Sequence, residues 1–195
     1  MSGVRHILGI LLVIGVPPAV AFWLLVHPFA RAWRRVPVGV TYAVLSAFLL
    51  GFGALLYAAR DRLLGRDLGT SWWTIGLGVV LYLSAAAISV RCRRQLSLGM
   101  FAGVPEVSSA AFPGRLLQDG IYGVVRHPRY ASVILGTAGF ALMVNYLGGY
   151  VVVAVSLLGL WPVIVVEERE LAERFGSAYL QYRARVPALI PRWRH

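Results

Sequence analysis

The chain has 195 residues, of which 58% are hydrophobic and only 14% are charged, with a mean hydropathy of +0.71. Because a soluble domain carries roughly 25% charged residues, this composition excludes an ordinary soluble protein and favours one compact membrane domain. The net charge is +11, and all 19 basic residues are arginines. They stand at the ends of apolar runs rather than on a face rich in base-stacking aromatic residues, which favours membrane lipids over nucleic acid as partners.

Three apolar runs fill residues 1–95. They are Ile7–Phe29, Val36–Ala59 and Ser71–Val90. Each is long enough to cross a bilayer, which takes roughly 20 residues. The first run could instead be a signal peptide, because Ala19-Val20-Ala21 resembles a cleavage site. Since the run continues in apolar residues past that point, we expect a retained helix that is kinked at its two prolines.

The second half of the chain begins with the polar stretch Arg91–Arg129, whose prolines and glycines predict mostly loop. Two shorter apolar runs, Tyr130–Val144 and Gly148–Val166, follow each other so closely that we expect a helical hairpin. The segment Glu167–Val186 carries aliphatic and aromatic residues at every fourth position, which predicts an amphipathic helix.

Together these elements predict an all-α integral membrane protein with about five transmembrane helices and a C-terminal amphipathic helix over a cytosolic site. We expect residues 1–195 to form a single membrane domain. Its residues 1–95 would be three N-terminal transmembrane helices, and residues 96–195 a catalytic loop, the helical hairpin and the C-terminal helix. The long loop and the tail carry six arginines each and the hairpin tip carries none. The positive-inside rule therefore predicts a bacterial inner-membrane protein whose active site faces the cytoplasm.

The segment Arg126-His127-Pro128-Arg129-Tyr130 stands where the long loop enters the fourth apolar run. Pro128 suits the first turn of a helix, which would leave N–H groups and the positive end of the helix dipole beside Arg126 and His127. Such a place suits a carboxylate or a phosphate. The alternative is that Arg126 and Arg129 contact lipid phosphates.

Two adjacent carboxylates, Glu167 and Glu168, follow nineteen uncharged residues. A carboxylate at the border of a membrane is costly unless it has a partner or is wet. Adjacent helical positions point about 100° apart, so the two cannot both face one ligand. We expect one to bind hydroxyl groups of a ligand and the other to pair with an arginine. The alternative is a solvated helix end.

The remaining polar residues give little indication of a function. Asn145 lies in the hairpin tip, where turn chemistry accounts for it, and we place it away from the site. His6, His27 and His195 are isolated and show no metal-ligand spacing, so we predict no metal site. Cys92 is the single cysteine and stands among arginines; an inert interfacial cysteine is the main interpretation, and a nucleophilic thiolate is the alternative.

The order of these features resembles the isoprenylcysteine carboxyl methyltransferase family and its phospholipid methyltransferase relatives. The resemblance covers about residues 114–191, and the first three apolar runs match only in kind. It rests on Gly120-Ile121-Tyr122, Arg126 to Tyr130, Glu167-Glu168 with Leu171, Phe175-Gly176 with Tyr179 and Tyr182, Val186-Pro187, and Ile190-Pro191.

The resemblance implies a helical membrane fold that binds S-adenosylmethionine between the loop, the hairpin and the tail. It also implies a lipophilic small-molecule or lipidated acceptor. Arg126 and Glu168 are the predicted catalytic residues, with Arg126 also expected to order the loop or to bind an anion. The implied cofactor-binding residues are Leu116, Leu117, Tyr122, His127, Pro128, Arg129, Tyr130 and Glu167.

Two positions depart from the family pattern. Ser132 stands where the family commonly has glycine, and it is small enough to serve. Val163 stands where the eukaryotic prenylcysteine enzymes carry an arginine associated with the substrate carboxylate, so methylation of a carboxylate does not follow from the resemblance. Two other interpretations stay open: an NADPH-dependent sterol-type reductase, whose family shares the Arg-His-Pro-x-Tyr motif, and a non-catalytic membrane scaffold.

Overall fold

The computed structural model describes residues 2–96, 98–101, 103–108 and 115–192. The described residues form a bundle of helices, with one isolated bridge between Asp67 and Tyr146 as the only strand-like pairing among them. Five long helices make up the bundle: α1 (Ser2–Val26), α3 (Val38–Ala58), α5 (Trp72–Arg93), α8 (Pro128–Val144) and α9 (Leu147–Phe175). Shorter helices connect or follow them: α2 (Ala30–Trp33), α4 (Arg60–Leu64), α6 (Leu98–Phe101), α7 (Val104–Val107), the 3-10 helix η1 (Gly120–Gly123) and α10 (Ser177–Arg185).

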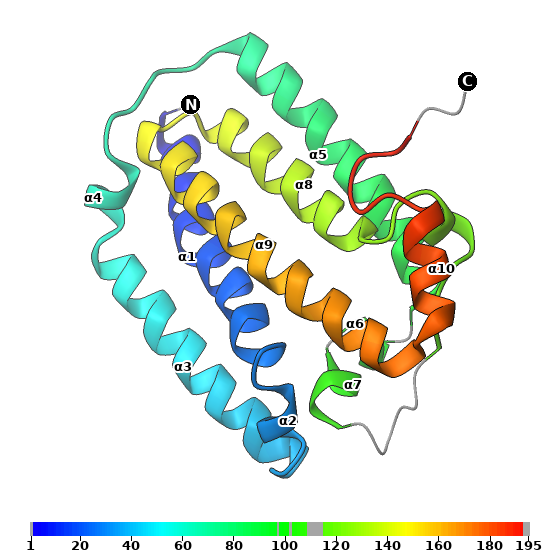
Figure 1. The fold of residues 1–195 in the computed structure, drawn as a ribbon. Helices are drawn as coiled ribbons and strands as arrows, with labels where there is room; N and C mark the ends of the chain where they lie inside the picture. Colours follow the sequence, from blue (N-terminus) through cyan, green and yellow to red (C-terminus); the bar gives the residue numbers. More distant parts are fainter. Residues whose placement is uncertain (1, 97, 102, 109–114, 193–195) are drawn as a thin grey trace.

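The bundle is organised around α1 and α9, which pack against each other with α3 on one side and the α5–α8 pair on the other (Figure 1). Four helices are long and apolar enough to cross a membrane, and α8 is a shorter apolar helix. Large apolar side chains point outward from them, such as Leu50, Trp73 and Leu158, which are at least 75% exposed. The prediction of an all-α membrane protein is therefore confirmed, while the described part of the chain has four helices of spanning length rather than the expected five or so.

The hairpin forms where the sequence predicts it. Pro128 occupies the first turn of α8, where its missing N–H costs no hydrogen bond. Asn145 ends α8 with a positive φ of 54°, a conformation that asparagine tolerates better than most residues. The segment Glu167–Val186, expected as one amphipathic helix, is helical over nearly all its length but is divided between two helices. Helix α9 continues without a break to Phe175, and Gly176, with a φ of 55°, starts a new direction for α10.

Helices α5 and α8 lie side by side along most of their length because small residues line their contact (Figure 1). A Cβ on Gly78 would stand 2.6 Å from the carbonyl oxygen of Gly139, and a Cβ on Gly139 would stand 2.6 Å from that of Gly78. Nearer the site, the Ser132 hydroxyl donates to the carbonyl of Ala85 at 2.9 Å and lies 2.8 Å from the Ser89 hydroxyl. The small side chain at position 132 therefore sets how closely α8 approaches α5.

A polar clasp of Arg5, Asp67, Gly69 and Asn145 closes the end of the bundle at the hairpin tip. The buried Arg5 guanidinium donates to the Asp67 carboxylate and to the carbonyl of Gly69. Asn145 donates to the same carbonyl at 2.8 Å and accepts from the Tyr150 hydroxyl at 2.8 Å. Asn145 is thus structural and lies away from the predicted site, as expected.

The arginine-rich segments gather at the opposite end of the bundle. Arg31 pairs with Glu173 at 3.0 Å, and Arg34 pairs with Glu170. These contacts bring the segment after α1 against the end of α9, near the long loop and α10 (Figure 1). The first loop, the long loop and the tail therefore share one end, which is the grouping that the alternation of five spans predicts.

The close α5–α8 contact makes a testable prediction. Gly78→Ala should lower the free energy of unfolding by about 1–3 kcal/mol, the usual cost of overpacking, because the new methyl group meets backbone. Gly76→Ala is the matched control on the same helix, since nothing lies within 4 Å of its Cβ, and replacing glycine there should stabilise the helix by up to about 1 kcal/mol. Denaturant unfolding in mixed micelles measures both, and equal effects would contradict the packing described.

The polar clasp makes a second prediction. The hydrogen bond from Arg5 lowers the pKa of the Asp67 carboxyl below its ordinary value of 3.8. A lowered folded-state pKa contributes stability that is complete above the ordinary value and is lost as the pH falls through the lowered one. Asp67→Asn should therefore lower the melting temperature by a few degrees at pH 7 and remove this acid-dependent part. Asp61→Asn, which removes an exposed ion pair, should change it little; an equal loss for both variants would refute the assignment.

Candidate functional site

A cavity, here called the loop cavity, opens at the arginine-rich end of the bundle. It lies between the end of α1, the segment before η1, the start of α8, the end of α9 and α10. Its described lining residues are Trp23, His27, Leu96, Met100, Arg115, Leu116, Leu117, Tyr122, Arg126, His127, Pro128, Arg129, Tyr130, Glu167, Leu171, Arg174, Phe175, Tyr179 and Tyr182. The structure therefore brings together segments that are more than a hundred residues apart in the sequence.

All the residues predicted from the sequence converge on this cavity, with one difference. Arg126 and the eight implied cofactor-binding residues line it, whereas Glu168 does not. Glu168 lies beside the cavity, and its side chain is only 12% exposed because two arginines and a histidine surround it. The expected division of labour between the adjacent carboxylates is present in the geometry: Glu168 pairs with arginine, and Glu167 faces the cavity.

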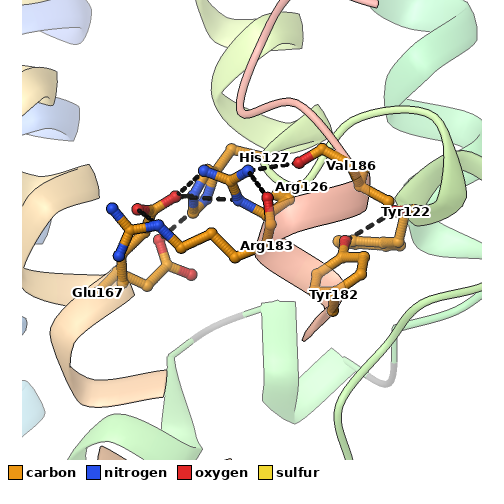
Figure 2. A network of polar contacts seen from close by, with 8 residues as sticks. Tyr122, Arg126, His127, Glu167, Tyr182, Arg183 and Val186 are labelled. Atoms are coloured by element: carbon orange, nitrogen blue, oxygen red, sulfur yellow. Dashed lines mark hydrogen bonds and ion pairs between the residues drawn. The ribbon is translucent and has the colours of Figure 1, made fainter. Parts of the chain in front are cut away.

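Arg126 and Glu168 form an ion pair at the centre of a polar network, in which Figure 2 labels Arg126, His127 and Arg183. Arg126 donates through Nε at 3.0 Å and through a terminal nitrogen at 2.5 Å to the same Glu168 oxygen. That oxygen also lies 3.1 Å from Nε2 of His127, and the second oxygen lies 3.5 Å from Nε of Arg183. Arg126 donates as well to the carbonyls of Arg183, at 3.1 Å, and Val186. One guanidinium thus joins the long loop, α9 and the C-terminal segment.

Backbone and tyrosine contacts reinforce this junction. The N–H of Arg126 donates to the carbonyl of Pro187 at 2.8 Å, and the N–H of His127 donates to that of Ala188 at 2.9 Å. The Tyr182 hydroxyl donates to the carbonyl of Tyr122 at 2.7 Å (Figure 2). Burial raises the pKa of Tyr182 to about 12, so its hydroxyl stays a proton donor at neutral pH. The N–H groups of Arg126 and His127 are therefore used by the chain itself and do not bind an anion.

Two oxygen atoms of the cavity wall lack a hydrogen-bond partner among the described residues. One is Oε2 of Glu167, which is buried and lies 3.7 Å from Nδ1 of His127. The other is the hydroxyl of Tyr179, a residue that is completely buried. Burial raises the pKa of Tyr179 to about 12, which keeps this hydroxyl protonated. Because a buried polar group without a partner is unfavourable, these two atoms are suited to bind the polar groups of a ligand.

Helix α1 contributes residues that the sequence interpretation missed. Trp23 and His27 line the loop cavity, with their rings stacked 5.3 Å apart. The Arg129 guanidinium lies 4.8 Å from the centroid of the Trp23 ring, a cation–π contact. The interpretation of His27 as isolated is correct along the sequence and wrong in space, since Nδ1 of His27 lies 3.9 Å from a carboxylate oxygen of Glu170. The only local signal was the Trp-x-x-x-His spacing, which is one helical turn.

A second cavity, here called the bundle cavity, lies between α1, α5, α8 and α9 and is partly open, because Leu11 and Tyr82 in its lining are about half exposed. Its lining is almost wholly apolar and consists of Leu11, Gly15, Val16, Ala19, Val20, Trp23, Tyr82, Arg129, Tyr130, Val133, Gly136, Thr137, Phe140 and Leu160. Trp23, Arg129 and Tyr130 line both cavities. These three side chains therefore stand between a cavity whose lining includes several charged groups and one that is almost wholly apolar.

Within the described ranges, no group of three His, Cys, Asp or Glu side chains is placed to hold a metal ion. Cys92 is 1% exposed, lies at the end of α5 and is outside both cavities. Its burial agrees with a packing role.

Loss of the Arg126 side chain should uncouple the C-terminal segment. Arg126→Ala should lower the free energy of unfolding by about 3 kcal/mol or more, because it leaves Glu168 short of a partner in a buried place, and should expose the segment after α10 to proteases. Arg185→Ala is the matched control, since Arg185 lies exposed on α10, and should shift the free energy by at most about 0.5 kcal/mol. Equal resistance of both variants to unfolding and to proteolysis would show that Arg126 does not join these segments.

Comparison with known proteins adds to this geometry. Residues 73–178, more than half of the chain, match the phospholipid methyltransferase family. The chain is 39% identical over 80 residues to the protein-S-isoprenylcysteine O-methyltransferase of Schizosaccharomyces pombe, which is 39% of this chain and 33% of that protein. It is 39% identical over 88 residues to methanethiol S-methyltransferase 1 of Bradyrhizobium diazoefficiens, which is 45% of this chain and 30% of that protein.

The chain is also 35% identical over 94 residues to methanethiol S-methyltransferase 2 of the same bacterium, which is 45% of this chain and 31% of that protein. The chain thus matches about a third of the length of each of these relatives. No solved structure matches it. None of these matches favours the reductase interpretation. Since more than half of its residues match the family, the chain belongs to the phospholipid methyltransferase family.

Proposed function

We propose that this chain is an S-adenosylmethionine-dependent methyltransferase that acts on a membrane-embedded or lipophilic acceptor. Family membership supports this proposal, and one observation carries it. The loop cavity, which nine of the ten predicted site residues line, holds two buried oxygen atoms without a hydrogen-bond partner among the described residues, Oε2 of Glu167 and the hydroxyl of Tyr179.

The residues of the loop cavity fit the proposed methyl donor. S-Adenosylmethionine has hydroxyl and ammonium donors, an aromatic base and a carboxylate. A carboxylate such as Glu167 accepts from hydroxyl or ammonium groups, and Tyr179 can donate to an acceptor atom. Leu116, Leu117 and Phe175 provide an apolar surface of the kind that holds an aromatic base. We infer that Glu167 and Tyr179 are the polar anchors of this site.

When bound, S-adenosylmethionine would supply a methyl group that is already activated by its sulfonium charge. The work of the protein is then to hold donor and acceptor in line and to exclude water. The Arg126–Glu168 pair supports this role by fixing the C-terminal segment beside the cavity. We therefore propose that Arg126 and Glu168, the predicted catalytic residues, act by ordering the site.

The bundle cavity is the proposed route and site for the acceptor. It is apolar and meets the loop cavity at Trp23, Arg129 and Tyr130, so an acceptor with an apolar tail could come from the bilayer and present its reactive group to the donor. Val163, the position at which the resemblance associates an arginine with a substrate carboxylate, is completely buried beside Val20 and Leu160 and lines neither cavity. This chain therefore has no cation at that position to pair with a carboxylate.

We further propose that the loop cavity faces the cytoplasm of a bacterial cell and that the chain lies in the inner membrane. The first loop, the long loop and the tail carry most of the arginines and share one end of the bundle, as the positive-inside rule expects for cytoplasmic segments. Access of S-adenosylmethionine, a cytosolic compound, agrees with this orientation.

Calorimetric binding to the protein purified in detergent tests the proposed function. Micromolar binding of S-adenosylmethionine and S-adenosylhomocysteine, with no binding of NADPH, would support a methyltransferase and would justify a screen of lipophilic acceptors. Binding of NADPH alone would overturn the proposal in favour of a reductase. A folded protein that binds none of the three would be a scaffold.

Two tyrosine variants should have opposite effects on the stability of the ligand-free protein. Tyr179→Phe should leave the stability of the ligand-free protein unchanged or raise it, because it removes a buried hydroxyl that lacks a partner. It should weaken S-adenosylmethionine binding about 5-fold, the equivalent of one hydrogen bond of about 1 kcal/mol. Tyr182→Phe, the control, breaks the bond to the Tyr122 carbonyl and should instead reduce stability by about 1 kcal/mol.

Glu167→Gln tests the second proposed polar anchor of the loop cavity. Loss of a charged acceptor should weaken binding of the donor about 10-fold or more, since bonds to charged groups are worth about 1.5–3 kcal/mol. Glu173→Gln, which changes an exposed carboxylate of the same helix outside the cavity, should bind normally. Normal binding by both Glu167→Gln and Tyr179→Phe would mean that the ligand site lies elsewhere.

A further inference from the structure

His27 occupies a place that neither the sequence motifs nor the family match accounts for. It follows the last residue of α1, is 5% exposed and lines the loop cavity. The family match begins at residue 73, so this histidine belongs to the part of the chain that the match does not cover. A buried histidine in a ligand cavity is a candidate for proton transfer, because its ordinary pKa lies near neutrality.

A carboxylate faces one edge of the His27 ring. Oε2 of Glu170 lies 3.9 Å from Nδ1 of His27, and the other oxygen of Glu170 accepts a hydrogen bond from Arg34. Arg34 thus holds the carboxylate in place. The separation from His27 exceeds a hydrogen bond, but catalytic hydrogen bonds are often long before a substrate binds. A base that is oriented by a third group is the usual arrangement for activating a nucleophile.

His27 also lies next to the place where the two cavities meet. Its ring stacks on Trp23, which lines both cavities, and the Arg129 guanidinium covers the same indole ring. An acceptor whose tail lies in the bundle cavity would have its reactive group at Trp23, Arg129 and Tyr130, one helical turn from His27. The histidine is therefore near the point where the proposed transfer would occur.

We propose that His27 is the general base of this methyl transfer, that Glu170 is its positioning residue, and that the acceptor is a thiol, an amine or an alcohol rather than a carboxylate. This inference rests on the proposed function and names its substrate class. The lone pair of the acceptor sulfur, nitrogen or oxygen forms a bond to the methyl carbon. The carbon–sulfur bond of the sulfonium breaks, and its electron pair stays on a neutral thioether sulfur. Nε2 of His27 takes the proton of the acceptor and passes it to water.

The alternative acceptor, a carboxylate, is already ionised and needs no base.

The environment of His27 sets the pH at which the base works. Glu170 and Arg34 lie on its Nδ1 side, and the charged or titratable groups that line the same cavity are Arg115, Arg126, His127, Arg129, Glu167 and Arg174, together with four tyrosines. The variant Glu170→Gln removes only the positioning carboxylate, so it measures how much that carboxylate changes the pH at which His27 acts as a base.

Four acceptors with the same ten-carbon tail test this proposal: decanethiol, decylamine, decanol and decanoate, each with S-adenosylmethionine and the full chain in detergent. The protein should methylate at least one of the first three. His27→Gln should lower kcat for that acceptor about 100-fold or more, as expected for loss of a general base, and should abolish the acidic limb of the pH–rate profile. Glu170→Gln should keep that limb and move it to lower pH, because the carboxylate favours the protonated imidazole.

The control variant is His6→Gln, which changes a partly exposed histidine of α1 outside both cavities and should leave kcat and the pH profile unchanged. Calorimetric affinity for S-adenosylmethionine should stay within twofold in Glu170→Gln and His6→Gln, which change no lining residue of the loop cavity. The same measurement on His27→Gln separates loss of the base from loss of the donor site. If His27→Gln does not fold, the proposal is tested by the shift of the acidic limb in Glu170→Gln: a shift to lower pH supports it, and an unchanged limb overturns it.

Three results would overturn the proposal while leaving the proposed methyltransferase intact: methylation of decanoate alone, an unchanged kcat and pH profile in His27→Gln, or binding of S-adenosylmethionine without methylation of any of the four acceptors. Failure of the wild-type protein to bind S-adenosylmethionine would instead refute the proposed function itself.

Discussion

The ion pair between Arg126 and Glu168 is the interaction on which the site depends. Arg126 stands just before α8, Glu168 lies in the last part of α9, and the same guanidinium binds carbonyls at the end of α10 and after it. Hydrogen bonds and ion pairs order this arginine-rich end of the bundle together with buried aromatic side chains such as Tyr122 and Tyr182. The pairing also turns Glu168 away from the cavity and leaves the adjacent Glu167 to face it.

Such a pair is costly to bury and is retained for what it positions. The attraction between two buried charges barely offsets the loss of their hydration, and their value lies in specifying one arrangement. Here Glu168 is satisfied by three cationic or polar neighbours beside the loop cavity, whereas Glu167 and Tyr179, which line it, keep oxygen atoms without partners among the described residues. The contrast separates residues that build the cavity from residues that are suited to bind a ligand.

Much of this could be predicted from the sequence, because the signals are local. The apolar runs predicted the spanning helices, and Pro128 predicted the start of α8. The angle of about 100° between adjacent helical positions predicted that Glu167 and Glu168 would point in different directions. The continuation of α9 beyond Val166 was missed because charged residues looked like a helix end, although their partners on other segments allow the helix to continue. The contribution of α1 was missed because Trp23 and His27 reach the cavity only through long-range packing, which no local pattern encodes.

The most direct test of the account is an experimental structure of the full chain with S-adenosylhomocysteine bound. We expect the ligand in the loop cavity, with polar groups within hydrogen-bond distance of Oε2 of Glu167 and the hydroxyl of Tyr179, and with the Arg126–Glu168 pair intact beside it. A ligand bound elsewhere, or bound in the loop cavity with Glu168 released from Arg126 and facing it, would contradict the central claim that this ion pair builds the site and leaves Glu167 to bind.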